Sequence, residues 1–443
     1  MCTTLFIKHM ERENWSSSFG FFLSCVGCAI GLGNIWLFPW RLSHYGSISF
    51  LIPYILFTFG FVAFGLMSEL ALGRKFQGGT IKAFEGAFGP QRKHMARIFG
   101  GFQVIAQSGI TVFYLIVMGW ILRYLWLSIT GELLTIEPEG EFSEFSGHSC
   151  VIPWHIAAVF ITGCVVYFGI EKGVEKANKW AISGMFLIFI ILIINTFTIP
   201  GATDGVRDFL HPKWDLLKSS ELWIMALGQS FFTVSLGGML IYGSYLKNES
   251  DVPKASYLIV STNLLASLLA AFIIIPAGAA FGISPDKGPG LLFMNMPHVF
   301  QQMPGGHFFG FAFFLSVFLA GLSSAINLME IPSEAFMHLF KISRRKATMS
   351  VVLLTLILGS PLTVSMSRFG SFVDLITIYL YPLGVLIIVF VAQWIWGSDK
   401  AYEAINEGSR YPISHRVKFL LKYIFLSICI LVYVLNIYFG GIG

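Results

Sequence analysis

The sequence predicts an all-α polytopic membrane protein, and two observations carry this prediction. Of its 443 residues, 55% are hydrophobic and only 12% are charged, which is far more apolar surface than a water-soluble core of this size needs. Apolar stretches of about 20 residues also recur along the chain, the length that crosses a bilayer as a helix. Lipid cannot satisfy backbone N–H and C=O groups, so each stretch is expected to be helical unless protein or a cavity surrounds it.

Eleven spans are expected where apolar runs lie between charged or glycine- and proline-rich breaks. They cover about 16–43, 47–72, 98–128, 151–170, 178–199, 221–245, 254–282, 307–338, 347–366, 372–396 and 417–439. The segment 76–94 is expected to carry an interfacial helix between the second and third spans. The segment 131–149 has five glutamates and no lysine or arginine, so we expect it to be a soluble outer loop.

The basic residues predict the orientation of these spans. With the N-terminus placed inside, 22 of the 29 lysines and arginines fall in inner segments, in agreement with the positive-inside rule. This bias also accounts for the net charge of +5 without a nucleic-acid partner. The first apolar run is too long for a secretory leader and lacks an obvious cleavage site. We therefore expect a multi-pass protein of the cell inner (plasma) membrane with a cytoplasmic N-terminus.

Two of the expected spans contain glycine-rich interruptions. The first is GCAIGLGNIWLFPW at 27–40 and the second is FFTVSLGGMLIY at 231–242, with Gly33 and Gly238 separated by 205 positions. Glycine lets the backbone leave helical geometry, which frees carbonyl groups and adds the partial charges of half-helix ends. Matched interruptions in two halves of a chain are typical of a transporter built from repeats, and five spans per repeat invert the second copy.

Several segments resemble the neurotransmitter:sodium symporter family, whose best-known bacterial member transports leucine. They are RENW (12–15), GLGNIWLFPW (31–40), IPY (52–54), GQSFFTVSLGG (228–238), YGSY (242–245), STN (261–263) and AGLSSAINLMEI (320–331). The resemblance covers nearly the whole chain. It implies eleven transmembrane helices in a 5+5 inverted-repeat leucine-transporter-type fold with broken helices 1 and 6.

The resemblance also implies a domain organisation and a function. The expected parts are a cytoplasmic N-terminus (1–15), a first inverted repeat with spans 1–5 (16–199), an extracellular loop (200–220), a second repeat with spans 6–10 (221–396), and a cytoplasmic loop with span 11 (397–443). The implied function is sodium-coupled import of an amino acid by alternating access. The protein is expected in the lipid bilayer as a monomer or a homodimer, and the sequence does not decide between them.

Two sodium sites are implied by the resemblance. The first takes the Ala29 carbonyl, the side chains of Asn34, Thr233 and Asn263, and the substrate carboxylate. The second takes the carbonyls of Gly27, Ile30 and Ala320 and the hydroxyls of Ser323 and Ser324. Sodium is a hard cation that needs several oxygen ligands, and these neutral oxygens supply them without burying net charge.

The implied substrate site lies near the membrane midplane. Backbone of Ala29, Leu32 and Gly33 and the Tyr114 hydroxyl are expected at the carboxylate, and backbone oxygens of Phe232, Thr233 and Ser235 at the amine. The expected side-chain pocket is formed by Ile110, Phe232, Ser324, Asn327 and Leu328. Monoamine-carrying relatives hold the amine with an aspartate where this chain has Gly31. A substrate with its own carboxylate, an amino acid, is therefore favoured.

A chloride site is implied by the same comparison. Chloride-independent bacterial members carry an acid where this chain has Ser267, and the chloride ligands of animal members correspond to Tyr54, Gln229, Thr233, Asn263 and Ser267. Two sodium ions beside a zwitterion leave excess positive charge in a low-dielectric site, which an anion should offset. The alternative is a carboxylate elsewhere in the chain, such as Glu330 or Asp374.

The gates depart from the family pattern. Arg12 and Trp15 match the inner gate, but its aspartate position holds His338, so Glu334 is the expected substitute. Asp374 resembles the acid of the outer gate, whose arginine position holds Leu37.

Other functions make different demands on the sequence. An enzyme would need clustered metal ligands or a nucleophile–base pair, and no HxxxH or HExxH arrangement occurs. A channel, a non-transporting membrane sensor and a sodium-independent amino acid transporter on the same fold stay open. Proton coupling in place of sodium is disfavoured by the paired hydroxyls of Ser323 and Ser324.

Overall fold

The computed structural model describes residues 13–233, 236–283 and 290–442, and its regular structure over these ranges is entirely helical. The longer helices and the halves of interrupted ones are α1 (Ser18–Ala29), α2 (Phe38–His44), α3 (Ile48–Phe57), α4 (Ala63–Phe76), α6 (Lys93–Thr130), α8 (Ile152–Tyr167), α9 (Lys176–Thr196), α11 (Ser220–Thr233), α12 (Met239–Gly243), α13 (Val252–Ala280), α15 (Gly306–Phe340), α16 (Arg344–Thr363), α17 (Met366–Asp374), α18 (Tyr381–Phe390), α20 (Arg416–Phe419) and α21 (Leu426–Phe439). Short peripheral helices are α5 (Thr80–Phe88), α7 (Pro138–Phe145), α10 (Ala202–Leu210), α14 (Met296–Gln302) and α19 (Ser398–Asn406).

Nine helical stretches in the described part are long and apolar enough to cross a membrane. They are Ile48–Phe76, Pro90–Thr130, Ser149–Tyr167, Ile170–Thr196, Val252–Ala280, Gly306–Phe340, Arg344–Thr363, Met366–Ile395 and Arg416–Phe439. The bent pair of α1 and the helical stretch Gly33–His44 makes a tenth. The expected sixth span, 221–245, contains residues 234–235, which lie outside the described residues, so the total of eleven stays a prediction.

The outer helices of the bundle present large apolar side chains on their exposed faces. Phe160 on α8, Leu187 and Ile194 on α9, Leu353 on α16 and Val434 on α21 are all more than half exposed. Such a continuous apolar surface is unstable in water but is what hydrocarbon solvates. The molecule is therefore a multi-pass membrane protein.

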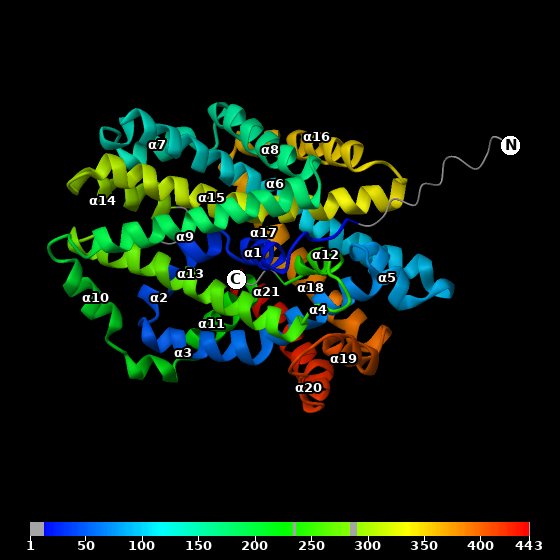
Figure 1. The fold of residues 1–443 in the computed structure, drawn as a ribbon. Helices are drawn as coiled ribbons and strands as arrows, with labels where there is room; N and C mark the ends of the chain where they lie inside the picture. The colour runs from blue at the N-terminus through cyan, green and yellow to red at the C-terminus, as the bar shows by residue number, and fades with distance from the viewer. Residues whose placement is uncertain (1–12, 234–235, 284–289, 443) are drawn as a thin grey trace.

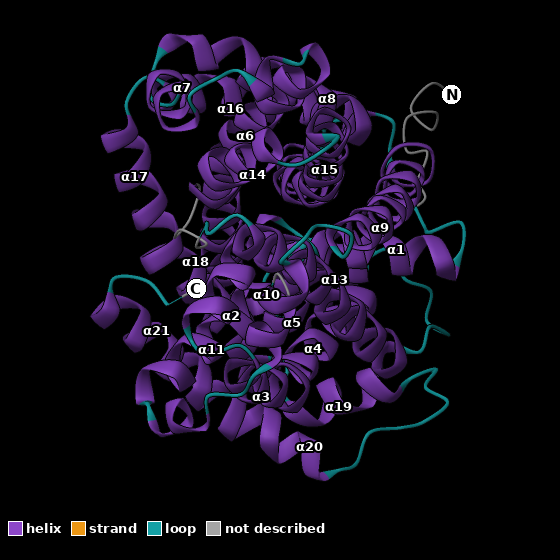
Figure 2. Ribbon diagram, turned by 90° about the vertical axis from the view of Figure 1, so that its left-hand side faces the viewer, coloured by secondary structure: helices purple, strands orange, loops and turns teal. Residues whose placement is uncertain are grey.

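The helix α1 lies in the middle of the bundle, where it packs against α9, α13 and α15. In Figure 1, α6, α8, α15 and α16 lie on one side of it and α3, α4 and α11 on the other. Figure 2, turned by 90°, shows the same separation, with α6, α15 and α16 in one group and α3, α4 and α11 in the other. A site at the end of α1 is therefore enclosed by helices on both sides.

The chain leaves helical geometry directly after α1. The helix ends at Ala29, Ile30 is extended (φ −84°, ψ 95°), and a short π-helical stretch, η1 (Gly33–Leu37), resumes the path at an angle of 58°. The Gly31 N–H, which an unbroken helix would use in its backbone ladder, donates instead to Asn34 Oδ1 at 3.0 Å. Carbonyls at the end of α1 are thereby left available for other partners.

A second interruption separates α11 from α12. Gly237 lies in it with φ +92°, a conformation that side-chain-bearing residues rarely adopt. Its N–H donates to Glu69 Oε1 of α4 at 2.6 Å, and Tyr381 Oη of α18 donates to the neighbouring Leu236 carbonyl at 2.7 Å. The backbone groups released here are thus bonded by side chains from two other helices, as buried polar groups require.

Both segments expected to lie outside the spans contain short helices. The helix α5 occupies the middle of 76–94, and α7 occupies part of 131–149. On the face that carries α7, Glu139 accepts from His298 of α14 at 3.0 Å.

Candidate functional site

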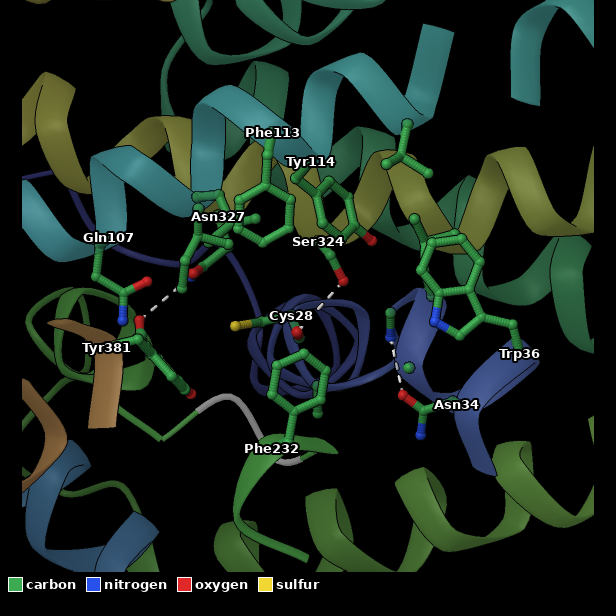
Figure 3. Close-up of a pocket in the computed structure, with 18 residues that line it drawn as sticks. Cys28, Asn34, Trp36, Gln107, Phe113, Tyr114, Phe232, Ser324, Asn327 and Tyr381 are labelled. Atoms are coloured by element: carbon green, nitrogen blue, oxygen red, sulfur yellow. Dashed lines mark hydrogen bonds between the residues drawn. The ribbon is translucent and has the colours of Figure 1, made fainter. Parts of the chain in front are cut away.

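A cavity of about 110 Å³ lies where α1 ends (Figure 3). Its lining comes from the interrupted segment after α1, from α6 and from α15, and is completed by Phe232, Gly238 and Tyr381. The volume is enough for a small solute, because about 10–15 Å³ on this measure holds one water molecule. The interruption of the first span therefore opens onto a cavity between the helices of the bundle.

Most of the residues expected at the substrate line this cavity. They are Ala29, Leu32, Gly33, Ile110, Tyr114, Phe232, Ser324, Asn327 and Leu328. Thr233, whose backbone oxygen is expected at the amine, is not among the described lining residues, and its side chain, like Ser235, lies outside the described residues. The assignment of carboxylate and amine ends within the cavity stays a prediction.

The cavity is also lined by residues that sequence reasoning did not assign to the substrate. They are Cys28, Gly31, Asn34, Trp36, Gln107, Phe113, Val117, Gly238 and Tyr381. Gln107 precedes Ile110 by three positions and Tyr114 by seven, so helical periodicity places it on the same face of α6 and was the signal to find it. No such signal exists for Tyr381, which reaches the cavity from α18 through tertiary packing.

Gly31 has little room for a side chain. A Cβ atom there would lie 3.2 Å from Ser324 Oγ and 3.3 Å from Tyr114 Oη. Both distances are tighter than ordinary van der Waals contact, so a carboxylate at this position would displace the two hydroxyls. The packing agrees with a site in which the ligand, and not the protein, supplies the carboxylate.

Five oxygens expected at the second sodium site converge between α1 and α15. Ser323 Oγ donates to the Gly27 carbonyl at 2.9 Å and to the Ala320 carbonyl at 2.7 Å. Ser324 Oγ donates to the Gly27 carbonyl at 3.0 Å and to the Ile30 carbonyl at 3.1 Å. These three carbonyls and two hydroxyls are neutral, hard oxygen donors of the kind that sodium prefers. Their chemistry fits the ion.

The residues expected at the first sodium site form a separate polar group. Asn34 Nδ2 donates to Asn263 Oδ1 at 2.8 Å and to Ser267 Oγ at 2.7 Å. Ser267 Oγ in turn donates to the Asn263 carbonyl at 3.0 Å. All three side chains are fully or almost fully buried. The group joins η1 to α13. The expected sodium ligands Asn34 and Asn263 and the expected chloride ligands Asn263 and Ser267 therefore share one hydrogen-bond network.

Gln229, another expected chloride ligand, lies beside a buried cation. Arg41 of α2 is 4% exposed, and its Nη1 donates to Gln229 Oε1 at 2.9 Å and to the Met225 carbonyl at 3.4 Å. Tyr54, a further expected chloride ligand, is fully buried, and its ring packs against that of Phe38 with the centroids 5.1 Å apart. Sequence reasoning did not single out Arg41, although a charged residue inside a membrane span is a functional candidate by default.

The face of the bundle at which α1 begins is closed by an ion-pair network, which we call the N-terminal network: Glu13, Tyr245, Glu330 and Arg344. Arg344 Nη1 donates to Glu330 Oε1 at 2.9 Å and to Oε2 at 2.6 Å, and Tyr245 Oη also donates to Glu330 Oε1 at 2.6 Å. Arg344 further contacts Glu13, whose Oε2 accepts from the Ile170 N–H at 2.8 Å.

Trp15, expected at the inner gate, lies next to this network. Its Nε1 donates to the Tyr242 carbonyl at 3.2 Å, and its ring meets those of Tyr242 and Tyr245 edge-on, at 5.1 and 6.0 Å. Arg12, the expected gate arginine, lies outside the described residues.

Glu334 and His338 have partners on the α4–α5 segment. Glu334 Oε1 accepts from the Gly79 N–H at 2.8 Å, and His338 Nε2 lies 3.2 Å from Glu85 Oε2. Burial of Glu85 acts to raise its pKa, but the hydrogen bond from Arg97 and the charges of His338 and Lys93 outweigh burial and hold the pKa below its ordinary value. Sequence reasoning missed the Glu85 partnership, because nothing in a linear pattern joins residues 253 positions apart.

The two residues expected at the outer gate are not part of the cavity. Asp374 at the end of α17 is exposed, and Leu37 at the end of η1 is only partly buried. Neither lines the pocket, in which Trp36 marks the end nearest to α2 (Figure 3). Their gating role stays a prediction.

These observations define a class of protein: a membrane transporter with an enclosed central site at the interruption of its first span. The chain belongs to the sodium:neurotransmitter symporter family, whose model matches residues 12–151 and 134–439.

Two prokaryotic relatives are each described as an uncharacterized sodium-dependent transporter. That of Methanocaldococcus jannaschii is 32% identical, over 94% of this chain and 88% of the relative. That of Bacillus subtilis is 31% identical, over 97% and 99%. The sodium-dependent serotonin transporter of Drosophila melanogaster is 28% identical, over 93% and 74%. A crystal structure of MhsT in complex with L-phenylalanine superposes with a TM-score of 0.84 at 30% identity, covering 96% of this chain and 100% of that chain.

Proposed function

We propose that the chain is a sodium-coupled symporter that imports an amino acid across the plasma membrane by alternating access. The observation that carries the proposal is the convergence of three carbonyls and two hydroxyls next to the central cavity. They belong to Gly27, Ile30, Ala320, Ser323 and Ser324. Ser324 belongs to both groups, because it bonds the Ile30 carbonyl and lines the cavity. Sodium and solute therefore share a residue, which is a direct way to couple their binding.

The proposed cycle uses the contacts on both sides of the cavity. With two sodium ions and the amino acid bound, α1 and the segment after α11 are held against α6 and α15. Release on the other side requires the start of α1 to separate from the N-terminal network and from Glu175, which accepts from the Ser16 N–H at 2.8 Å and from Ser17 Oγ at 3.0 Å. The proposed topology places this face in the cytoplasm, as the spans rock between the two states.

The proposal is tested by uptake into proteoliposomes. Amino acids are screened with an inward sodium gradient and with choline in its place, and accumulation only with sodium is expected. Ser323→Ala removes one of the five oxygens and should raise the sodium concentration for half-maximal uptake by about tenfold or more.

Ser316→Ala is the matched control for this substitution. Ser316 is also fully buried in α15, but its hydroxyl bonds only the Phe313 carbonyl of its own helix, so its sodium dependence should be unchanged. Equal accumulation in choline would exclude sodium coupling and favour a proton-coupled transporter. Absence of accumulation, together with sodium-dependent binding, would favour a sensor.

We also propose that transport requires chloride, held near Tyr54, Gln229, Asn263 and Ser267. The guanidinium of Arg41 beside Gln229 adds positive charge to this region, which favours an anion. The two alternative carboxylates do not offset it: Glu330 is paired with Arg344, and Asp374 is exposed. Replacing chloride by gluconate should abolish most sodium-driven uptake, and an unchanged rate would refute the proposal.

A further inference from the structure

The cavity is lined by uncharged groups alone. Its 18 described lining residues include no aspartate, glutamate, lysine, arginine or histidine. A charged substrate side chain would be desolvated there without a partner of opposite charge, which is strongly unfavourable. The substrate side chain is therefore neutral.

One buried side chain in the lining has an amide that bonds no group among the residues the structure describes. Gln107 of α6 is 2% exposed, and within the described part of the chain only its backbone is bonded; its carbonyl accepts from Thr111 Oγ1 at 3.0 Å. Buried side-chain amides are almost always bonded at both their donor and their acceptor. The Gln107 amide instead faces the cavity, where a ligand can reach it (Figure 3).

Gln103, one turn earlier on α6, is bonded to the protein at its amide nitrogen, while its Oε1 is buried without a partner among the described residues. It is fully buried, its Nε2 donates to the Gly237 carbonyl at 3.2 Å, and it does not line the cavity. The two glutamines therefore differ at the amide nitrogen: that of Gln103 donates to the protein, whereas the Gln107 side chain lines the cavity and bonds no described residue.

The position of Gln107 corresponds to the distal end of a bound amino acid. Gln107 and Tyr114 are separated by seven residues, which is two helical turns or about 10.5 Å along α6. Tyr114 is at the proposed carboxylate end, next to Leu32 and Gly33, and the apolar Ile110 lies between. In Figure 3, Gln107, Asn327 and Tyr381 lie at one end of the pocket, and Asn34 and Trp36 at the other.

The other polar groups at this distal end are already partly engaged. Tyr381 Oη donates to the Leu236 carbonyl at 2.7 Å, and Asn327 Nδ2 makes a long hydrogen bond of 3.4 Å to the Gly238 carbonyl. Gln107 is thus the residue at this end whose amide most needs both a hydrogen-bond acceptor and a donor from the ligand.

We propose that the pocket selects a neutral amino acid with a terminal carboxamide, glutamine in the first place, and that Gln107 determines this specificity. The inference rests on the proposed function, because it names the substrate class of the same site. A carboxamide pairs its oxygen and its NH₂ with the complementary groups of the Gln107 amide, while Ile110, Phe232 and Leu328 contact the aliphatic stem. Methionine has nearly the same length and width but offers only a weak acceptor.

The test compares glutamine with methionine on the intact protein in proteoliposomes. Each unlabelled amino acid competes with the sodium-driven uptake of labelled glutamine, and sodium-dependent thermal stabilisation in detergent is measured in parallel. Glutamine should act at a concentration at least tenfold lower than methionine, leucine or phenylalanine, since a site built to bond a substrate group rejects analogues that lack it.

Three variants locate the effect. Gln107→Met should raise the half-maximal glutamine concentration by at least tenfold and leave methionine unchanged or improved. Gln107→Asn keeps the amide and should retain part of the preference for glutamine. Gln103→Met, the matched control, removes a buried amide outside the pocket, so it should lower the unfolding temperature without changing the order of preference.

Two results would overturn the inference. Methionine or phenylalanine acting as well as glutamine on the unaltered protein, or an unchanged order of preference in Gln107→Met, would show that water satisfies Gln107 and that the side chain does not select. Sodium-driven transport would stand in either case. If no amino acid gives a sodium-dependent response, the proposed function fails together with the inference.

Discussion

Glu330 is the centre of the N-terminal network, and its substitution by glutamine should open that face of the protein. The side chain is fully buried on α15 and receives hydrogen bonds from Arg344 and from Tyr245, which follows α12. Glu330→Gln keeps the shape of the residue but removes the charge that holds Arg344. The closed arrangement of α12, α15 and α16 then loses its strongest contact.

The size of the effect follows from the burial of the pair. Removing one partner of a buried ion pair costs about 3–5 kcal/mol when the remaining charge is left alone. Arg344 is 12% exposed and keeps its contact with Glu13, so we expect a smaller loss, about 2 kcal/mol. That loss shifts the balance between closed and open forms by about 30-fold.

Access to α1 from the N-terminal face measures this shift. Cys25 and Cys28 are buried on α1, and Cys28 lines the cavity. In a background with Cys2, Cys150 and Cys164 replaced by serine, a maleimide reagent should label these α1 cysteines at least tenfold faster in Glu330→Gln.

A matched control breaks an ion pair elsewhere in the molecule. Arg123 and Glu141 join α6 to α7 at 3.0 Å, on the face opposite the N-terminal network, so Glu141→Gln should leave the labelling rate unchanged. Equal labelling in Glu330→Gln and the parent would refute the view that this network keeps the face closed.

Two further predictions concern the backbone at the second interruption and the surface of α5. Gly237→Ala forces a side chain into φ +92° and places its Cβ 2.7 Å from Gln103 Nε2, so it should destabilise the protein by about 1–2 kcal/mol; thermal unfolding checks this, with Gly101→Ala, which meets no neighbour, as the neutral control. The lowered pKa of Glu85 contributes stability that is present above its ordinary pKa and lost as pH falls through the folded value. Glu85→Gln should therefore flatten the acid side of the curve of unfolding temperature against pH, and an unchanged curve would contradict this.

The spans and the first interruption could be anticipated because their causes are local. A run of apolar residues must become a helix in lipid wherever it occurs. The segment GCAIGLGNIWLFPW also contains three glycines, which let the backbone leave helical geometry. The residues that meet at the interruption were predicted from the family resemblance. The expected second sodium site, with Ser323 and Ser324, shows why motif matching could bring these residues together. The hydroxyls and carbonyls involved follow one another closely on two segments, so motif matching identifies them together.

The unanticipated contacts join segments that are distant in the chain. Arg41 against Gln229, His338 against Glu85, and Tyr381 at the cavity each depend on which helices become neighbours. Hydropathy and periodicity describe one segment at a time and contain no information on such pairs.

The sequence by itself determined that this protein crosses a membrane many times and that its first span is interrupted near glycines. Lipid offers no hydrogen bonds to the backbone, so apolar runs must be helical, and glycine permits the chain to leave the helix where protein surrounds it. Only the tertiary structure decided that Gln107 faces an enclosed cavity while Gln103 bonds the protein. The two glutamines are alike in type and lie one turn apart, and the helices packed around α6 decide which of them lines the cavity.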